Sequence, residues 1–171
     1  LYFTLYFITI MNAYVTAPIS SLFRTLTPDE LHHSLQTSLL HWDQNSDVWV
    51  FAYGSLIWRP EFDFIEQRAA RLAGYHRSLC LWSRINRGTP DIPGIVFALD
   101  QGGECEGVVY RIAADQVKAT FPALWQREMP SGAYNPKWVD CHTEESHTVS
   151  ALAVIINPQT DAYGPSMPLE Q

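Results

Sequence analysis

The sequence predicts one domain of the α+β class. Three observations predict it: a capped amphipathic helix that begins near residue 28, a continuous apolar run at residues 48–53, and further strand-like segments on both sides of a second helical stretch. The chain has 171 residues, of which 47% are hydrophobic and 17% are charged. This length and composition are typical of one globular domain with its own core, and they exclude a disordered chain, a coiled coil and collagen.

The first predicted helix opens with a capping box. Residues 27–30 read Thr-Pro-Asp-Glu, which places a threonine cap three residues before a glutamate and a proline at the first helical position. The apolar residues that follow share one helical stripe: Leu31, Leu35, Leu39 and Trp42. We therefore expect an amphipathic helix that ends before the polar residues 43–47.

Apolar runs and turn residues predict the strands. The run at residues 48–53 has no polar alternation, so we expect a strand that is covered on both faces. The other predicted strands cover residues 68–83, 92–99, 106–112, 138–143 and 147–156. Gly102-Gly103 is expected to turn a hairpin between two of these strands, and the polar residues 144–146 are expected to turn the last hairpin.

A second helix is predicted over about residues 114–129, and it has a carboxylate on its apolar face. At about 100° per residue, one narrow stripe of this helix contains Val117, Phe121, Leu124, Trp125 and Glu128. Arg127 points elsewhere on the same helical wheel. Because burial of a carboxylate raises its pKa, Glu128 is a candidate general base or acid. The alternative is a structural ion pair, or a glutamate at a frayed helix end beside Pro130.

The predicted strand at 48–53 ends abruptly at Tyr53-Gly54-Ser55-Leu56. A glycine there lets the backbone bend tightly, so that successive N–H groups can form a concave site for a carboxylate or an oxyanion. The alternative is an inert Gly-Ser turn. Ser55 is a poor candidate nucleophile, because its surroundings lack the Gly-x-Ser-x-Gly pattern of esterases.

Two arginines lie in the predicted loop between the strands at 68–83 and 92–99. Arg84 and Arg87 are close to Gly88 in this loop. An arginine beside a glycine can bind a carboxylate through two hydrogen bonds, so Arg87 is a candidate substrate-binding residue. The alternative is an exposed arginine without a ligand.

Cys141, His142 and His147 are residue types that can bind a metal ion. Adjacent residues of a strand point to opposite faces, and the sequence has no second pair of ligands at a suitable spacing. We therefore expect no zinc site here.

Charge and cysteine content limit the partners and the compartment. The net charge is −7, from 18 acidic and 11 basic residues, which is the wrong sign for a general binder of nucleic acid or of membrane surfaces. The three cysteines are odd in number and widely spaced, without a Cys-x-x-Cys motif. This pattern favours a reducing compartment, and we expect a cytoplasmic protein.

Taken together, these motifs resemble the ChaC family of glutathione-specific γ-glutamylcyclotransferases. The resemblance begins at residues 48–60, Val-Trp-Val-Phe-Ala-Tyr-Gly-Ser-Leu-Ile-Trp-Arg-Pro. It continues in order through Gly-Tyr-His-Arg at 74–77, Asn-Arg-Gly-Thr at 86–89, Pro-Gly at 93–94, Glu-Gly-Val-Val-Tyr at 106–110, Leu-Trp-Gln-Arg-Glu-Met at 124–129, Gly-x-Tyr at 132–134 and Tyr-Gly-Pro at 163–165. A single Tyr-Gly-Ser would be a weak signal, but this many blocks in one order is specific.

The resemblance implies a small mixed β-barrel with flanking helices. It also implies an enzyme that releases 5-oxoproline and Cys-Gly from glutathione, without a cofactor or a metal. By this resemblance, Glu128 matches the catalytic glutamate, Tyr53 to Leu56 match the substrate loop, and Tyr134 matches a pocket tyrosine. Two alternatives remain open: a cyclotransferase for other γ-glutamyl amines, and a non-catalytic binding domain.

The two ends of the sequence lead to separate expectations. The first ten residues are apolar and too short to span a bilayer. We expect Met11 to be the natural start, and a short β segment at residues 1–10 is the alternative. Residues 1–45 are expected to form an N-terminal extension with one amphipathic helix, and residues 46–171 a γ-glutamylcyclotransferase-like domain that is incomplete at its C-terminus. Residues 163–171 are expected to be loop-like and poorly tied down.

Overall fold

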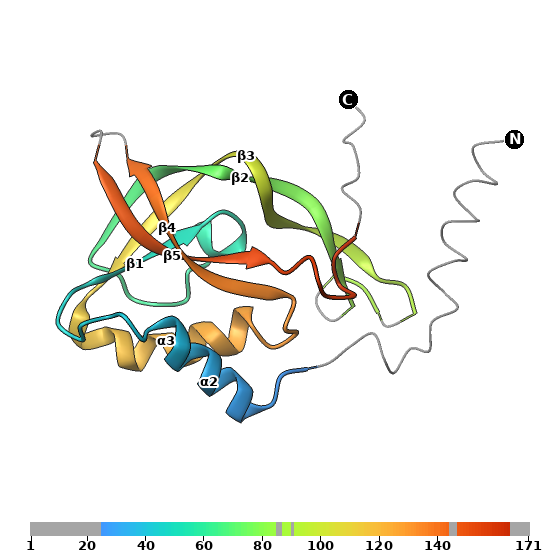
Figure 1. Ribbon diagram of the computed structural model, residues 1–171, viewed down its shortest axis with the longest axis horizontal. Helices are drawn as coiled ribbons and strands as arrows, with labels where there is room; N and C mark the ends of the chain where they lie inside the picture. The colour runs from blue at the N-terminus through green and yellow to red at the C-terminus, as the bar shows by residue number, and fades with distance from the viewer. Residues whose placement is uncertain (1–24, 85–86, 90, 144–146, 165–171) are drawn as a thin grey trace, which may run out of the picture.

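The computed structural model of the chain describes residues 25–84, 87–89, 91–143 and 147–164 (Figure 1). The expectations for residues 1–10, for Met11 and for residues 165–171 lie outside the described residues. Within the described ranges, no helix is long and apolar enough to cross a membrane.

Five strands close into a small mixed barrel, which confirms the expected fold. They are β1 (Val48–Ala52), β2 (Glu66–Ser83), β3 (Gly94–Ile112), β4 (Tyr134–Thr143) and β5 (Thr148–Ile156). Around the barrel the order is β1-β3-β2-β4-β5. The barrel closes through a parallel pairing of β1 with β5, in which Val50 lies opposite Leu152, and the other neighbours are antiparallel.

The helices α2 (Pro28–Ser38) and α3 (Ala114–Glu128) lie side by side along one side of the barrel (Figure 1). The capping box of α2 is present as predicted, since the N–H of Glu30 donates to Oγ1 of Thr27 and the N–H of Thr27 donates to Oε2 of Glu30. Trp125 of α3 donates its indole N–H to Oγ of Ser34 at 3.2 Å, which joins the two helices.

The buried face of α3 matches the predicted stripe. Its fully buried residues are Val117, Phe121, Leu124 and Trp125. The helix continues through Pro122 without a break. It ends at Glu128, and the N–H of the next residue, Met129, still donates to the carbonyl of Trp125 at 2.9 Å before Pro130 follows.

Strand β1 lies between two apolar cores, as the continuous apolar run predicts. Val48, Val50 and Ala52 belong to a core that includes the apolar faces of α3 and, at its margin, α2. Phe51 and Tyr53 belong to a second core, to which all five strands contribute and which therefore fills the barrel. The end of β1 thus lies at the boundary between the barrel interior and the helices.

The expected hairpin at Gly102-Gly103 is wrong. Strand β3 runs without reversal from residue 94 to residue 112 and pairs with β2 along its length, so the predicted strands 92–99 and 106–112 are one. Gly102 and Gly103 have φ of +98° and +66°, and they lie beside Gly74, with φ of +83°, where the register shifts. Glycines can adopt these angles within a bulge that bends the ladder. The chain reverses in the connection between β2 and β3, where a loop was also expected.

Tyr163 and Gly164 are more firmly held than expected. The N–H of Gly164 donates to the carbonyl of Cys80 at 2.8 Å, and the phenol of Tyr163 donates to Oδ2 of Asp100 at 3.0 Å. A Cβ added at Gly164 would come within 2.2 Å of Nε1 of Trp82. This close approach explains a glycine at position 164, and it corrects the expectation of a loose segment for these two residues.

Candidate active site

Glu128 is the last residue of α3 and lies at an apolar hollow. Its side chain is 17% exposed, and the other residues around the hollow are Val50, Phe51, Leu56, Leu124, Trp125, Leu152 and Val154. Burial raises the pKa of Glu128 above its ordinary value. The helical wheel therefore placed this carboxylate correctly, and the structure provides the environment expected of a general acid or base.

Two tyrosines lie beside this carboxylate. Tyr53 follows β1 and is buried, whereas Tyr134 begins β4 and is half-buried. The two phenols lie close enough to influence each other's pKa. Burial, and then the charge of Glu128, raises the pKa of Tyr134, and burial is also the largest cause of the raised pKa of Tyr53. Both phenols therefore remain protonated at neutral pH and can act as hydrogen-bond donors.

The chain between α3 and β4 brings Tyr134 to Glu128. The N–H of Gly132 donates to the carbonyl of Met129, and Gly132 has φ of +65°, an angle that favours glycine. The carbonyl of Ala133 accepts from the N–H of Asn157 at 2.8 Å, which fastens this turn just after β5. The turn thus favours a glycine at position 132, two residues before Tyr134.

The predicted turn at Tyr53-Gly54-Ser55-Leu56 lies against the same hollow. Leu56 is buried and lines the hollow with Glu128, whereas Ser55 is exposed. Within the turn, the N–H of Ile57 donates to the carbonyl of Gly54 at 3.0 Å. The N–H groups of the preceding residues, Gly54, Ser55 and Leu56, are of the kind that can donate to an anionic ligand at such a turn.

Gly54 leaves open space in front of the turn. It has φ of −132° and ψ of −132°, a combination outside the helical and extended regions. A Cβ added there would meet nothing within 4 Å. The expected bend of the backbone at this glycine is therefore present, and the space in front of it is free.

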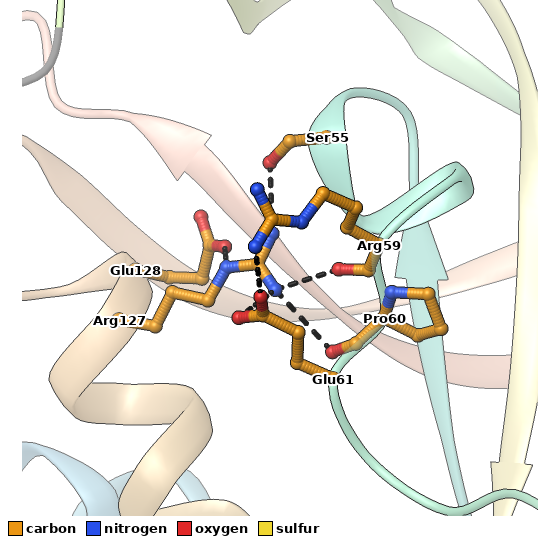
Figure 2. Close-up of polar contacts among 6 residues, drawn as sticks. All are labelled: Ser55, Arg59, Pro60, Glu61, Arg127 and Glu128. Carbon is orange, nitrogen blue, oxygen red and sulfur yellow. Dashed lines mark hydrogen bonds and ion pairs between the residues drawn. The ribbon is translucent and has the colours of Figure 1, made fainter.

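The side chain of Arg127 does not point where the helical wheel predicts. Its Nε lies 3.1 Å from Oε1 of Glu128, so the side chain turns toward the carboxylate (Figure 2). Its Nη1 donates to Oε2 of Glu61 at 2.9 Å, and Glu61 also accepts from Arg59. The cluster of Arg59, Glu61 and Arg127 was not predicted from the sequence. The signal was the arginine next to the candidate glutamate, but the wheel describes only where a side chain begins.

Arg87 is not joined to this cluster by any contact among the described residues. Its side chain is exposed in the connection between β2 and β3, and its N–H donates to Oγ of Ser83 at 3.2 Å. Its predicted role in substrate binding stays a prediction.

Cys141 and His142 are neighbours near the end of β4. Cys141 is buried and His142 is exposed, so they occupy opposite faces of the strand. Across the described ranges, no three His, Cys, Asp or Glu side chains lie close enough to hold a metal ion.

The chain matches a known family along most of its length. Residues 48–171 match the model of the family described as ChaC-like protein. The glutathione-specific gamma-glutamylcyclotransferase of Escherichia coli strain K12 is 37% identical over 130 residues, which cover 76% of this chain and 56% of that protein. The human glutathione-specific gamma-glutamylcyclotransferase 1 is 34% identical over 124 residues, which cover 70% of this chain and 56% of the relative. The chain spans about half the length of the curated relatives it matches.

Solved structures support the same fold. The crystal structure of a selenomethionine-labelled gamma-glutamyl cyclotransferase specific to glutathione from yeast aligns with a TM-score of 0.66 at 21% identity, covering 72% of this chain and 75% of that one. YkqA from Bacillus subtilis aligns with a TM-score of 0.55 at 20% identity, covering 80% of this chain and 48% of that one. At these identities the likeness establishes the fold.

Proposed function

The chain belongs to the ChaC-like family, and from this premise we propose that it cyclises the γ-glutamyl group of glutathione to 5-oxoproline and releases Cys-Gly. The observation that carries the proposal is the carboxylate of Glu128, held in an apolar hollow beside Tyr53 and Tyr134. The names of the two relatives described above support glutathione as the substrate.

The proposed reaction uses the substrate's own nucleophile. The α-amine of the γ-glutamyl group attacks the γ-carbonyl carbon, a five-membered lactam forms, and the amide bond to the cysteine nitrogen breaks. Because both reacting groups belong to one molecule, folding the substrate correctly supplies most of the required proximity. This chemistry needs neither a nucleophile from the protein nor a metal or other cofactor.

In this proposal Glu128 moves the proton. Its carboxylate accepts a proton from the α-ammonium group, which frees the amine for attack, and then returns a proton to the departing nitrogen. A group that does both works best when its pKa lies near the working pH, and burial shifts the pKa of Glu128 in that direction.

The neighbouring groups would hold and polarise the substrate. The N–H groups of Gly54, Ser55 and Leu56 can donate to the α-carboxylate or to the oxyanion that forms at the γ-carbon, and the space in front of Gly54 admits the ligand. Tyr53 and Tyr134 can donate to the same oxygens. The exposed side chain of Arg87 is proposed to bind a substrate carboxylate.

We also propose a cellular compartment and a class of binding partner for the chain. Cys80, Cys105 and Cys141 are all free and buried, which supports a reducing, cytoplasmic compartment. The net charge of −7 supports a small-molecule substrate over nucleic acid or a membrane surface as the partner.

The test is release of 5-oxoproline by the purified chain, measured for glutathione and for γ-glutamyl-alanine in parallel. Product from glutathione alone supports the proposal. Product from γ-glutamyl-alanine, with none from glutathione, would instead indicate a cyclotransferase for other γ-glutamyl amines. A folded chain that binds glutathione without turnover would indicate a binding domain.

A further inference from the structure

One arginine fastens the substrate turn to the helix that ends in the proposed catalytic glutamate. Arg127 uses all three guanidinium nitrogens, and each has a different target (Figure 2). Its Nε pairs with Oε1 of Glu128 at 3.1 Å, and its Nη2 donates to Oγ of Ser55 at 3.2 Å. Its Nη1 donates to the carbonyl of Arg59 at 2.6 Å and to Oε2 of Glu61 at 2.9 Å.

This arrangement differs from an ordinary surface ion pair. The side chain of Arg127 is 24% exposed, and in the described part of the chain it donates every hydrogen bond that joins residues 55–61 to α3. An exposed pair contributes little because two mobile side chains must be ordered for one contact. A planar guanidinium with partners on two elements fixes their relative position, which the single ammonium group of a lysine cannot do.

We propose that Arg127 is a positioning residue, which holds the turn at residues 53–56 against Glu128. Its positive charge is shared between Glu61 and Glu128. Glu61 and Arg127 therefore together set the pH range in which Glu128 works. The proposal rests on the proton-transfer role proposed for Glu128.

The charges around Glu128 act in opposite directions. Burial raises its pKa most, the guanidinium of Arg127 lowers it, and the carboxylate of Glu61 raises it. Hydrogen bonding by Arg59, and then the charge of Arg127, lowers the pKa of Glu61, so Glu61 is ionised at neutral pH. The other titratable groups beside Glu128, Tyr53 and Tyr134, have raised pKa values and stay neutral at neutral pH.

Two substitutions should therefore shift the pKa of Glu128 in opposite directions. Arg127→Gln removes the stabilising cation, so the pKa should rise and activity should begin at a higher pH than in the wild type. Glu61→Gln removes the competing anion and leaves Arg127 to Glu128, so the pKa should fall and activity should begin at a lower pH. A purely structural role for Arg127 would not produce this opposition.

A lysine variant separates charge from position. Arg127→Lys keeps a positive charge near Glu128. Compared with Arg127→Gln, it should therefore return the acid side of the activity–pH profile toward that of the wild type. It cannot reach Ser55, Glu61 and Glu128 together, so kcat should stay low, by up to about 10²-fold for a misplaced reacting geometry. Arg71→Gln is the matched control, because Arg71 pairs with Glu104 at 3.4 Å on the exposed surface of the barrel.

The deciding experiment is a carbon-13 NMR titration of the Glu128 carboxyl in the wild type, Arg127→Gln, Glu61→Gln and Arg71→Gln, with 5-oxoproline release from glutathione measured on the same samples. Opposite shifts in Arg127→Gln and Glu61→Gln, with none in the control, support the proposal. Shifts in the same direction, or no shift in either variant, overturn it.

The titration and the activity assay keep two failures apart. If the wild type releases no 5-oxoproline, the proposed function fails, while the titration still decides whether Arg127 and Glu61 control the ionisation of Glu128. If Arg127→Gln does not fold, Glu61→Gln and Arg127→Lys provide the test: an unchanged Glu128 titration in Glu61→Gln then overturns the proposal.

Discussion

The phenols of Tyr53 and Tyr134 lie close enough to each other and to the carboxylate of Glu128 for these groups to influence one another's pKa. Each protonated phenol has one O–H group that it can donate. Glu128 or a substrate oxygen can therefore accept a hydrogen bond from this pair. Because burial and the charge of Glu128 keep both phenols protonated, this donor persists through the neutral pH range.

Tyr134→Phe should weaken the binding of glutathione without unfolding the chain. It removes one hydroxyl and keeps the ring, so we expect KM to rise by about 2- to 10-fold, the value of one neutral hydrogen bond. Steady-state kinetics measure it. Tyr75→Phe is the control, because the phenol of Tyr75 accepts from Lys137 at 2.8 Å, away from the hollow. An unchanged KM in Tyr134→Phe would remove Tyr134 from the substrate site.

Glu128→Gln should leave a folded chain with almost no activity. Glutamine keeps the shape of the side chain but cannot accept and return a proton, and loss of general acid–base catalysis costs about 10²- to 10⁴-fold in rate. The measurement is 5-oxoproline release, with circular dichroism to establish folding. Glu104→Gln, half exposed on β3, is the control. Near-normal turnover in Glu128→Gln would contradict a role for this carboxylate.

The same substitution should stabilise the fold, and more so at neutral than at acid pH. Burial raises the pKa of Glu128 in the folded state, so the folded chain binds this proton more tightly than the unfolded chain does. The wild type therefore loses stability as pH rises from the unfolded pKa through the folded one, whereas glutamine does not titrate. Denaturant unfolding at acid and neutral pH measures the difference, and a gap between the two proteins that is independent of pH would contradict the prediction.

The turn at residues 53–56 should tolerate loss of its hydroxyl better than added bulk. Gly54→Val places a branched side chain in the open space before the turn, so KM should rise sharply while thermal stability changes little. Ser55→Ala removes one of the acceptors of Arg127, so its effect should be smaller. Kinetics and thermal melts of both variants test the ranking. The reverse ranking, with Ser55→Ala inactive and Gly54→Val tolerated, would indicate a serine nucleophile.

Sequence patterns correctly predicted the features that depend on residues close together along the chain. The capping box at residues 27–30 and the apolar stripe of α3 depend on neighbours within one or two turns, and both are present. The same stripe identified Glu128, because the direction in which a helical side chain leaves the backbone follows the helical phase.

Contacts between distant segments were not predictable in the same way. Gly102 and Gly103 look like a turn in isolation, and their place in a bulge depends on Gly74 in the paired strand. Arg127 has a long, flexible side chain, so its direction depends on Glu61 and Ser55, which are brought close by the fold. No spacing along the chain encodes either relationship.

The three thiols should be unreactive in the folded chain, and activity should survive alkylation. Burial raises the pKa of Cys80 to about 11 and that of Cys141 to about 12, and it also raises the pKa of Cys105. The thiolate is the reactive form, so each thiol should react slowly with iodoacetamide at neutral pH.

Mass spectrometry of the labelled chain, with 5-oxoproline release measured on the same sample, tests this prediction, and the denatured chain is the control for full labelling. Chelation should also leave the rate unchanged, because ring closure uses the substrate's own amine as the nucleophile. Activity that falls in step with labelling of one thiol would indicate a reactive cysteine. Activity that is lost to a chelator and restored by zinc would return Cys141, His142 and His147 to consideration as ligands.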